Sequence, residues 1–293
     1  MNKLTRITGG LLLCVSGIST AYADILDYNH ASSYSEIGAE LVTYAESTTV
    51  GGYPLTMSAT VTNMVQRSGG YTPVSEFGGF YIQTATTLDP LSAHEEWDIS
   101  PFGIIQTNER KVRWNELNAY YSWLFRDTGY QVVGGMGIST LSFIRSDFQR
   151  STGTSAFETS LGSTLSIFPG AISEDSTHVV ANVGFRYDST FVDPDETTRF
   201  QWGISAGVPV YYKVENSNFP GTTWTENFQG YDVTGNVGYG FQLHEKFLMS
   251  MSAEVLYKLR PETSGKAVAG GTGRIPEVTV SNVRLTAGLE WSY

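Results

Sequence analysis

The sequence has almost no cysteine and few histidines. Its single cysteine is Cys14, and its four histidines, His30, His94, His178 and His244, are widely separated. A lone cysteine cannot form a disulfide framework, and scattered histidines lack the spacing of a metal site. We therefore expect no disulfide, no thiol chemistry, no metal and no cofactor.

Basic residues are also scarce. The chain carries 18 Lys and Arg against 29 Asp and Glu, so its formal net charge is −11. An acidic chain repels a phosphate backbone, which argues against nucleic acid as a partner.

The first 23 residues have the pattern of a secretory signal peptide. Lys3 and Arg6 give a positive start, residues 11–15 an apolar centre, and residues 21–23 (Ala-Tyr-Ala) a small-x-small cleavage site. Cleavage there would remove Cys14 and leave 16 basic and 29 acidic residues, a charge of −13. We expect a secreted chain without cysteine.

No run of about 18 apolar residues follows this leader, so no membrane-spanning helix is predicted. The chain is nevertheless rich in aromatics and glycine, with 17 Tyr, 15 Phe, 6 Trp and 31 Gly, at a mean hydropathy of −0.14. This combination suits a transmembrane β-barrel, because only half the residues of each barrel strand face lipid.

The last eleven residues, 283–293, alternate strictly between apolar and polar and end on an aromatic. Leu289, Trp291 and Tyr293 lie on the apolar face, and Arg284 and Glu290 on the polar one. A barrel needs such a strand to pair with its first strand and remove both sheet edges. We take Leu289, Trp291 and Tyr293 as a C-terminal assembly signal.

The same alternation recurs along the chain between clusters of Gly, Asp, Asn, Pro and Ser. It predicts an all-β fold, a transmembrane antiparallel up-and-down β-barrel of about twelve strands over residues 34–293, after a short N-terminal segment, 24–33. The expected strands are 34–46, 55–66, 76–86, 99–108, 112–126, 130–144, 156–168, 178–188, 199–213, 228–243, 247–260 and 278–293.

Two segments raise questions of placement. In 55–66, the apolar side chains are expected to face lipid and the alternating hydroxyls the lumen. Residues 34–46 fit a strand, which we favour, but also an amphipathic helix that could plug the barrel. The turn assignment makes 108–111 and 145–155 periplasmic and 127–129 an unusually tight outer turn.

Strand parity places charged side chains of both signs in the lumen. The structural interpretation is a network of ion pairs that stiffens the wall. The functional interpretation is a ring of charges that selects solutes. The predicted lumen residues are Glu116, Glu158, Arg186, Lys213, Asp232, Glu254, Lys258, Arg284 and Glu290.

One catalytic hypothesis stays open. His178 is expected at the head of a strand, near Glu174, Asp175 and Ser176, where it could act as a base in a lipid-acting hydrolase. The alternative is a histidine that is simply hydrogen-bonded at a strand end. We expect no enzyme.

An uninterrupted barrel that ends in 288–293 (Gly-Leu-Glu-Trp-Ser-Tyr) resembles the translocator barrel of bacterial autotransporters. Only about ten residues, 24–33, precede the first expected strand, so the chain looks like the solitary, passenger-less members of that group. The resemblance implies insertion by the barrel-assembly machinery and leaves an export role in doubt.

These patterns predict a multi-pass barrel in the bacterial outer membrane. We expect it to contact outer-membrane lipids and lipopolysaccharide and to be monomeric. The expected role is a narrow pore or a structural membrane component. The alternatives are a substrate-specific channel for small polar solutes and the lipid-acting hydrolase.

Overall fold

The computed structural model describes residues 31–125, 128–165, 170–193, 197–244, 246–268 and 271–292. The predicted signal peptide, most of segment 24–33 and Tyr293 lie outside these residues. Among the described helices, none is long and apolar enough to cross a membrane.

Strands dominate the described chain. They are β1 (Ser32–Val50), β2 (Tyr53–Ser75), β3 (Gly78–Pro90), β4 (Ser92–Ile99), β5 (Gly103–Leu124), β6 (Tyr130–Arg150), β7 (Ile172–Asp188), β8 (Thr198–Asn216), β9 (Thr223–Glu226), β10 (Tyr231–His244), β11 (Phe247–Arg260), β12 (Lys266–Val268), β13 (Gly271–Gly273) and β14 (Glu277–Ser292). The described helices are short: α2 (Thr154–Leu161) and the 3₁₀ turn η1 (Ser189–Phe191).

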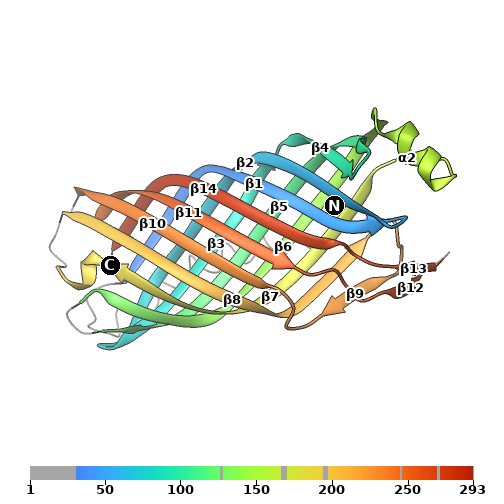
Figure 1. Ribbon diagram of the computed structural model, residues 1–293. Coiled ribbons are helices and arrows are strands. Elements are labelled where there is room, and N and C mark those ends of the chain that lie inside the picture. Colours follow the sequence, from blue (N-terminus) through green and yellow to red (C-terminus); the bar gives the residue numbers. More distant parts are fainter. Residues whose placement is uncertain are drawn as a thin grey trace.

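The sheet closes into a barrel (Figure 1) because β14 pairs along its length with β1. The antiparallel register runs from Ser32 opposite Ser292 to Ser47 opposite Glu277. The last strand therefore seals the seam, as its alternation predicted. Segment 34–46 is a wall strand within β1, and the helical plug considered for it is wrong.

The main sheet contains twelve strands, all paired antiparallel, in agreement with the predicted fold class. β3 and β4 follow one another along a single position between β2 and β5, and β9 pairs only with β8. A circuit of the wall therefore passes ten positions, in the order β1, β2, β3 with β4, β5, β6, β7, β8, β10, β11 and β14.

Several predicted segments differ from the structure in the first half of the chain. Segments 99–108 and 112–126 are largely one strand, β5, so the turn expected at 108–111 is wrong. Segment 156–168 is not a strand, because residues 154–161 form α2. Because of these errors, the turns in this region were assigned to the wrong ends of the barrel. This explains the misfit at 127–129, since Thr128 and Gly129 connect β5 to β6 at the end where β14 finishes.

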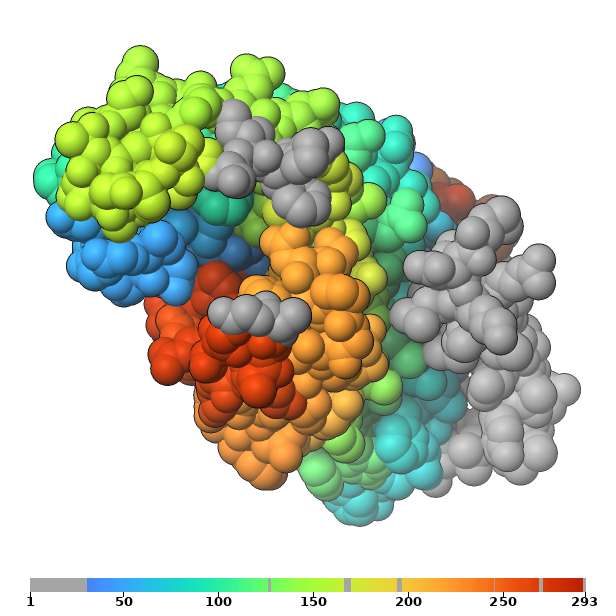
Figure 2. Space-filling model, turned by 90° about the vertical axis from the view of Figure 1, so that its right-hand side faces the viewer, coloured from blue at the N-terminus to red at the C-terminus, as the bar shows by residue number. Residues whose placement is uncertain are grey.

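The two ends of the barrel differ. At the end we call the terminal end, β1 begins, β14 finishes and the connections are mostly short; α2, β9, β12 and β13 lie at the opposite end, the loop end (Figure 1). Figure 2 views the loop end, where the segments around α2 and the β8–β10 and β11–β14 connections gather around the mouth.

The outer face changes character between these ends. Near the terminal end it is apolar, with Ile37, Met136, Val183 and Leu285 exposed. Near the loop end it is polar, and on β2 the exposed outward residues are Thr56, Ser58, Thr60 and Thr62. We call the first region the membrane half and the second the loop half.

The lengths of the strands agree with this division. β2 and β6 have 23 and 21 residues, which at about 3.3 Å per residue and a tilt near 40° rise roughly 55 Å. A lipid-facing band is only about 25 Å tall. About half of the wall therefore extends beyond the lipid.

The orientation predicted for 55–66 is consequently wrong. Leu55, Met57, Ala59 and Val61 are at most 5% exposed and face the interior. The hydroxyls between them face outward, because this part of β2 lies in the loop half, where water surrounds the wall. Alternation gave the two faces correctly, but it could not say which face met lipid.

Candidate functional site: the lumen

The inward face of β1 shows how the interior is layered. From the terminal end it carries Glu36, Glu40, Val42, Tyr44 and Glu46, all at most 4% exposed. Carboxylates thus lie on both sides of an apolar step. The other strands continue this order, so an apolar layer separates a charged membrane half from a second charged cluster in the loop half.

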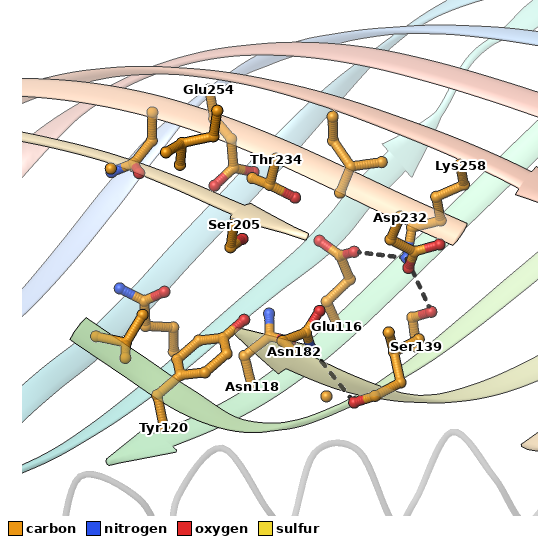
Figure 3. Close-up of a pocket in the computed structure, with 18 of the residues that line it drawn as sticks. Glu116, Asn118, Tyr120, Ser139, Asn182, Ser205, Asp232, Thr234, Glu254 and Lys258 are labelled. Carbon is orange, nitrogen blue, oxygen red and sulfur yellow. Dashed lines mark hydrogen bonds and ion pairs between the residues drawn. The ribbon is translucent and has the colours of Figure 1, made fainter. Parts of the chain in front are cut away.

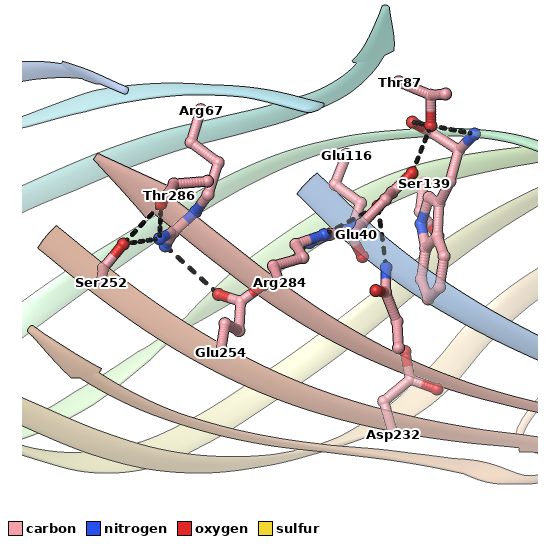
Figure 4. Close-up of polar contacts among 12 residues, drawn as sticks. Glu40, Arg67, Thr87, Glu116, Ser139, Asp232, Ser252, Glu254, Arg284 and Thr286 are labelled. Carbon is pink, nitrogen blue, oxygen red and sulfur yellow. Dashed lines mark hydrogen bonds and ion pairs between the residues drawn. The ribbon is translucent and has the colours of Figure 1, made fainter. Parts of the chain in front are cut away.

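Arg284 is the centre of the charged layer in the membrane half (Figure 4). Its Nε lies 3.1 Å from Glu40 Oε2, and its Nη1 lies 2.6 Å from Glu116 and 2.8 Å from Glu254. Arg67 extends the layer, with 3.3 Å contacts to Glu36 and Glu254. Burial in a low dielectric requires such pairing, because an isolated buried charge is strongly unfavourable.

The same layer reaches from wall to wall. Lys258 Nζ on β11 lies 3.2 Å from Glu116 on β5 and 3.3 Å from Asp232 on β10. β5 and β11 are five positions apart on the ten-position circuit, so the Lys258–Glu116 pair crosses the full width of the lumen. The contacts of the lumen charges therefore agree with the structural interpretation, a network of ion pairs.

On the loop-end side of this network lies the apolar layer, a single cluster of buried side chains. Tyr44 on β1 and Phe143 on β6 meet edge to face, with ring centroids 5.5 Å apart. Trp114 closes the layer toward the charges, with Lys258 Nζ 4.8 Å from its ring centroid. The members of this layer are Val42, Tyr44, Val61, Val112, Trp114, Leu141, Phe143, Leu256, Val278 and Val280.

The loop half holds the second charged cluster. Arg145 contacts Glu46 and Glu95 at 2.6 Å each, and Arg110 pairs with the same two carboxylates. Burial alone raises the pKa of Glu95, but the two guanidinium groups outweigh it and lower that pKa to about 2. β4, which carries Glu95, has only polar side chains outward and lies beyond the lipid-facing band.

Glu174 lies in this half too and is not paired with a cation. Asn216 Nδ2 donates to it at 2.8 Å. Burial first, and then the nearby charge of Glu46, raise the pKa of Glu174 to about 7. The loop half therefore contains one carboxylate that is held ionised and one that favours its protonated form.

Most of the predicted lumen residues do face the interior. One of them, Glu290, belongs to a third cluster near the terminal end, in which Arg199 pairs with both Glu290 and Asp188. The inward set is Glu116, Arg186, Asp232, Glu254, Lys258, Arg284 and Glu290.

Two predicted lumen residues are elsewhere. Glu158 is on α2, outside the wall, and pairs with Arg150. Lys213 faces outward and pairs with Glu215 at 2.8 Å. An irregularity in the β7–β8 register, between the pairs at Val179 and Val180, inverts the parity beyond it, so simple alternation put Lys213 on the wrong face.

Sequence reasoning missed more than half of the network. The missed charged residues are Glu36, Glu40, Glu46, Arg67, Glu95, Arg110, Arg145, Asp188, Arg199 and Arg260. A signal existed in β1, where Glu36 and Glu40 alternate with Ile37, Ala39 and Leu41. Around Arg110 on β5 no such signal exists, because both faces of residues 108–111 are polar.

The assembly-signal residues lie on the final strand as expected where they are described. Leu289 is outward and 47% exposed, and Trp291 is partly exposed on the same strand.

His178 makes contacts that bear on the catalytic hypothesis. Arg260 Nε donates to His178 Nδ1 at 2.9 Å, so the proton of a neutral ring is on Nε2. Nε2 lies 3.0 Å from Ser176 Oγ and donates to it, while Ser176 Oγ donates to the Leu141 carbonyl at 3.1 Å. A base must accept the serine proton, and in this arrangement His178 supplies one.

A cavity of about 70 Å³ remains in the membrane half, bounded by the charged network (Figure 3). Polar side chains from β5, β6, β7, β8, β10 and β11 line it. Those labelled in the figure are Glu116, Asn118, Tyr120, Ser139, Asn182, Ser205, Asp232, Thr234, Glu254 and Lys258. In the part of the chain that the structure describes, no group of three or more His, Cys, Asp or Glu could hold a metal ion.

No protein-family model matches the chain, and no curated protein matches it in sequence. Among solved structures, it is similar to the outer membrane protease OmpT from Escherichia coli, with a TM-score of 0.66 at 11% identity over 90% of this chain and 97% of that chain.

Two autotransporter barrels are also similar. The translocator domain of NalP from Neisseria meningitidis gives a TM-score of 0.41 at 11% identity over 98% of both chains. The transport unit of AIDA-I from Escherichia coli gives 0.42 at 9% identity over 95% of this chain and 97% of that chain. The likeness to OmpT shows that the chain has the fold of an outer-membrane β-barrel, in agreement with the predicted fold class.

Proposed function

We propose that this protein is a structural component of the outer membrane whose barrel is closed to solutes, rather than an open pore. The observation that carries the proposal is the succession of two layers across the lumen. Lys258 and Glu116 meet across its full width, and Tyr44, Trp114 and Phe143 are at most 2% exposed directly above them. A hydrophobic constriction of this kind also disfavours ions because they would lose their hydration.

Planar-bilayer recording of the folded, purified barrel tests this proposal. We expect no steady single-channel conductance from the wild-type protein. Insertion of the wild-type protein is checked separately by its co-flotation with lipid vesicles. The variant Tyr44→Gly, Trp114→Gly, Phe143→Gly, Lys258→Ala removes both the rings of the apolar layer and the ion pair across the lumen, and it should conduct. Steady conductance of the wild-type protein would refute the closed state.

We further propose that the barrel is not a hydrolase acting through His178. Support comes from the hydrogen bonds around the ring, in which Arg260 occupies Nδ1 and directs the Nε2 proton to Ser176. Phospholipid and lipopolysaccharide turnover by wild type and His178→Ala should be equal and at background. Turnover that disappears in His178→Ala would refute this.

The partners follow from the same fold and are also proposals. The exposed apolar face of β14 suits recognition by the barrel-assembly machinery, and the polar loop half suits contact with lipopolysaccharide headgroups. Because the wall closes on itself through β1 and β14, it needs no second copy to complete its sheet, and we propose a monomer.

A further inference from the structure

The cavity in the membrane half is lined by hydrogen-bonding groups that the protein leaves unused. Within the described residues, the side chains of Gln83, Asn118, Tyr120, Arg186 and Asn236 line it and make no hydrogen bond or ion pair. All five side chains are partly exposed to the cavity, so water or a small ligand can reach them. Polar groups withdrawn from bulk water are nearly always hydrogen-bonded, to protein or to something else, so the cluster indicates a site that receives water or a small ligand.

Arg186 gives this site its charge. Its guanidinium stacks on the ring of Tyr81, with Cζ 4.1 Å from the ring centroid, so the plane of donors is held in place by packing. The five N–H groups remain available, in the geometry that suits the two oxygens of a carboxylate or phosphate.

The carboxylates around the cavity are already engaged by other cations. Glu116 is paired with Arg284 and Lys258, and Glu254 with Arg284 and Arg67. Asp232 is likewise paired, with Lys258 and Arg260. Among the residues the structure describes, Arg186 is the one cation at this level that makes no ion pair with a carboxylate, so its N–H donors have no protein acceptor.

Glycines on the neighbouring strands make room for the amides. A Cβ atom on Gly137 would lie 2.2 Å from Asn118 Oδ1, and one on Gly203 would lie 2.7 Å from Asn236 Oδ1. Both distances are impossible for real contacts, so any larger residue would displace these amides. The two glycines therefore leave the amides room beside the cavity.

The cavity continues toward the terminal end. A second cavity, of about 30 Å³, adjoins the first and shares Gln83, Arg186 and Asn236 with it, and Ser32 and Gly70 near the terminal end also line it. Toward the loop end, Trp114 and the apolar layer block the way. In an outer-membrane barrel whose last strand ends on the periplasmic side, a ligand would enter from the periplasm.

We propose that this cavity is a binding site for a small oxyanion, a carboxylate or phosphate, held by Arg186 and by the amides of Asn118 and Asn236. A volume of about 70 Å³ holds roughly five waters, which is room for an anion of acetate or phosphate size. The site does not depend on whether the barrel conducts, so its failure and the failure of the closed-barrel proposal are distinguishable.

Ligand-observed NMR on the folded protein in detergent tests the site, with ¹³C-acetate and inorganic phosphate as probes and methylammonium as the cation control. Both anions should show saturable line broadening and should compete with one another, and methylammonium should show none. Arg186→Gln should weaken anion binding at least tenfold, while Lys213→Gln, which removes an outward cation, should leave it unchanged.

A second variant keeps the test decisive if Arg186→Gln folds poorly. Gly203→Ala retains every charge but brings a Cβ atom to 2.7 Å from Asn236 Oδ1 and 3.1 Å from Arg186 Cγ, so both side chains must shift, and it should weaken binding severalfold. Absence of saturable broadening in the wild type would overturn the proposal. Binding that survives in a folded Arg186→Gln protein, or that falls equally in Lys213→Gln, would also overturn it, as would equal broadening of methylammonium.

Discussion

The membrane half and the loop half of this barrel are inverted versions of one wall. In the membrane half, apolar side chains such as Leu285 point outward, and charged ones such as Arg284 fill the interior. In the loop half, hydroxyls such as Thr60 point outward, and Val61 lies inside. Side chains alternate between the two faces in both halves. Whether lipid or water surrounds a half decides whether apolar or polar side chains face outward there.

The largest expected effect is in the interior of the membrane half. Arg284→Ala would leave Glu40, Glu116 and Glu254 without their shared partner, and removing one member of a buried ionic cluster costs about 3–5 kcal/mol. Urea unfolding in detergent micelles should show this loss. Lys213→Ala, which removes an exposed ion pair, should leave the midpoint unchanged, and equal midpoints for both variants would contradict the importance of the cluster.

The outer faces allow a matched pair of substitutions. Leu285→Arg puts a charge into the lipid-facing band and should destabilise the membrane-inserted barrel by about 2–4 kcal/mol. Thr60→Arg makes the same kind of change in the loop half, where water already surrounds the wall, and should be within about 0.5 kcal/mol of wild type. Similar losses at both positions in lipid vesicles would show that the boundary between the halves is misplaced.

The free energy of unfolding should depend on pH through two carboxyl groups of the loop half, with opposite signs. The pKa of Glu95, lowered from 4.5 to about 2, gives stability that is present above pH 4.5 and is lost as pH falls toward 2. The pKa of Glu174, raised from 4.5 to about 7, gives a loss as pH rises from 4.5 to 7. Each effect is on the order of 2–3 kcal/mol, so stability should peak near pH 4.5.

Unfolding midpoints measured from pH 3 to 8 check this peak. Glu174→Gln removes the group that must ionise in a buried site, so it should abolish the decline above pH 4.5 and leave the acid-side decline intact. A variant profile that follows the wild type on the alkaline side would exclude Glu174 as the cause.

How much the sequence predicted depended on which half a residue occupies. In β14, apolar and charged residues alternate cleanly, so its seam with β1 and the inward placement of Arg284 and Glu290 followed directly. In β5, residues 108–111 are polar on both faces, because the outer face meets water and the inner face belongs to the cluster of Arg110. That run looked like a turn, and the strand count around it was wrong.

The site was predictable to a similar degree. Inward residues such as Glu116 and Lys258 were found by parity, since their strands cross the lipid. Lys213 was misplaced because a register irregularity in β8 reverses parity, and such an irregularity leaves no mark in the pattern. The unpaired state of Arg186 could not be predicted either, because it depends on which cations reach Glu116, Glu254 and Asp232 across the lumen.

The sequence by itself determined a closed antiparallel barrel, since strand alternation, the absence of a long apolar run and the apolar final strand each reflect a local preference of the chain for lipid on one side and water on the other. Only the tertiary structure decided that the lumen is crossed by ion pairs and capped by aromatic rings. Those contacts join strands up to half a circumference apart, such as Lys258 on β11 and Glu116 on β5, and they depend on the diameter and shear of the wall, which no single strand encodes.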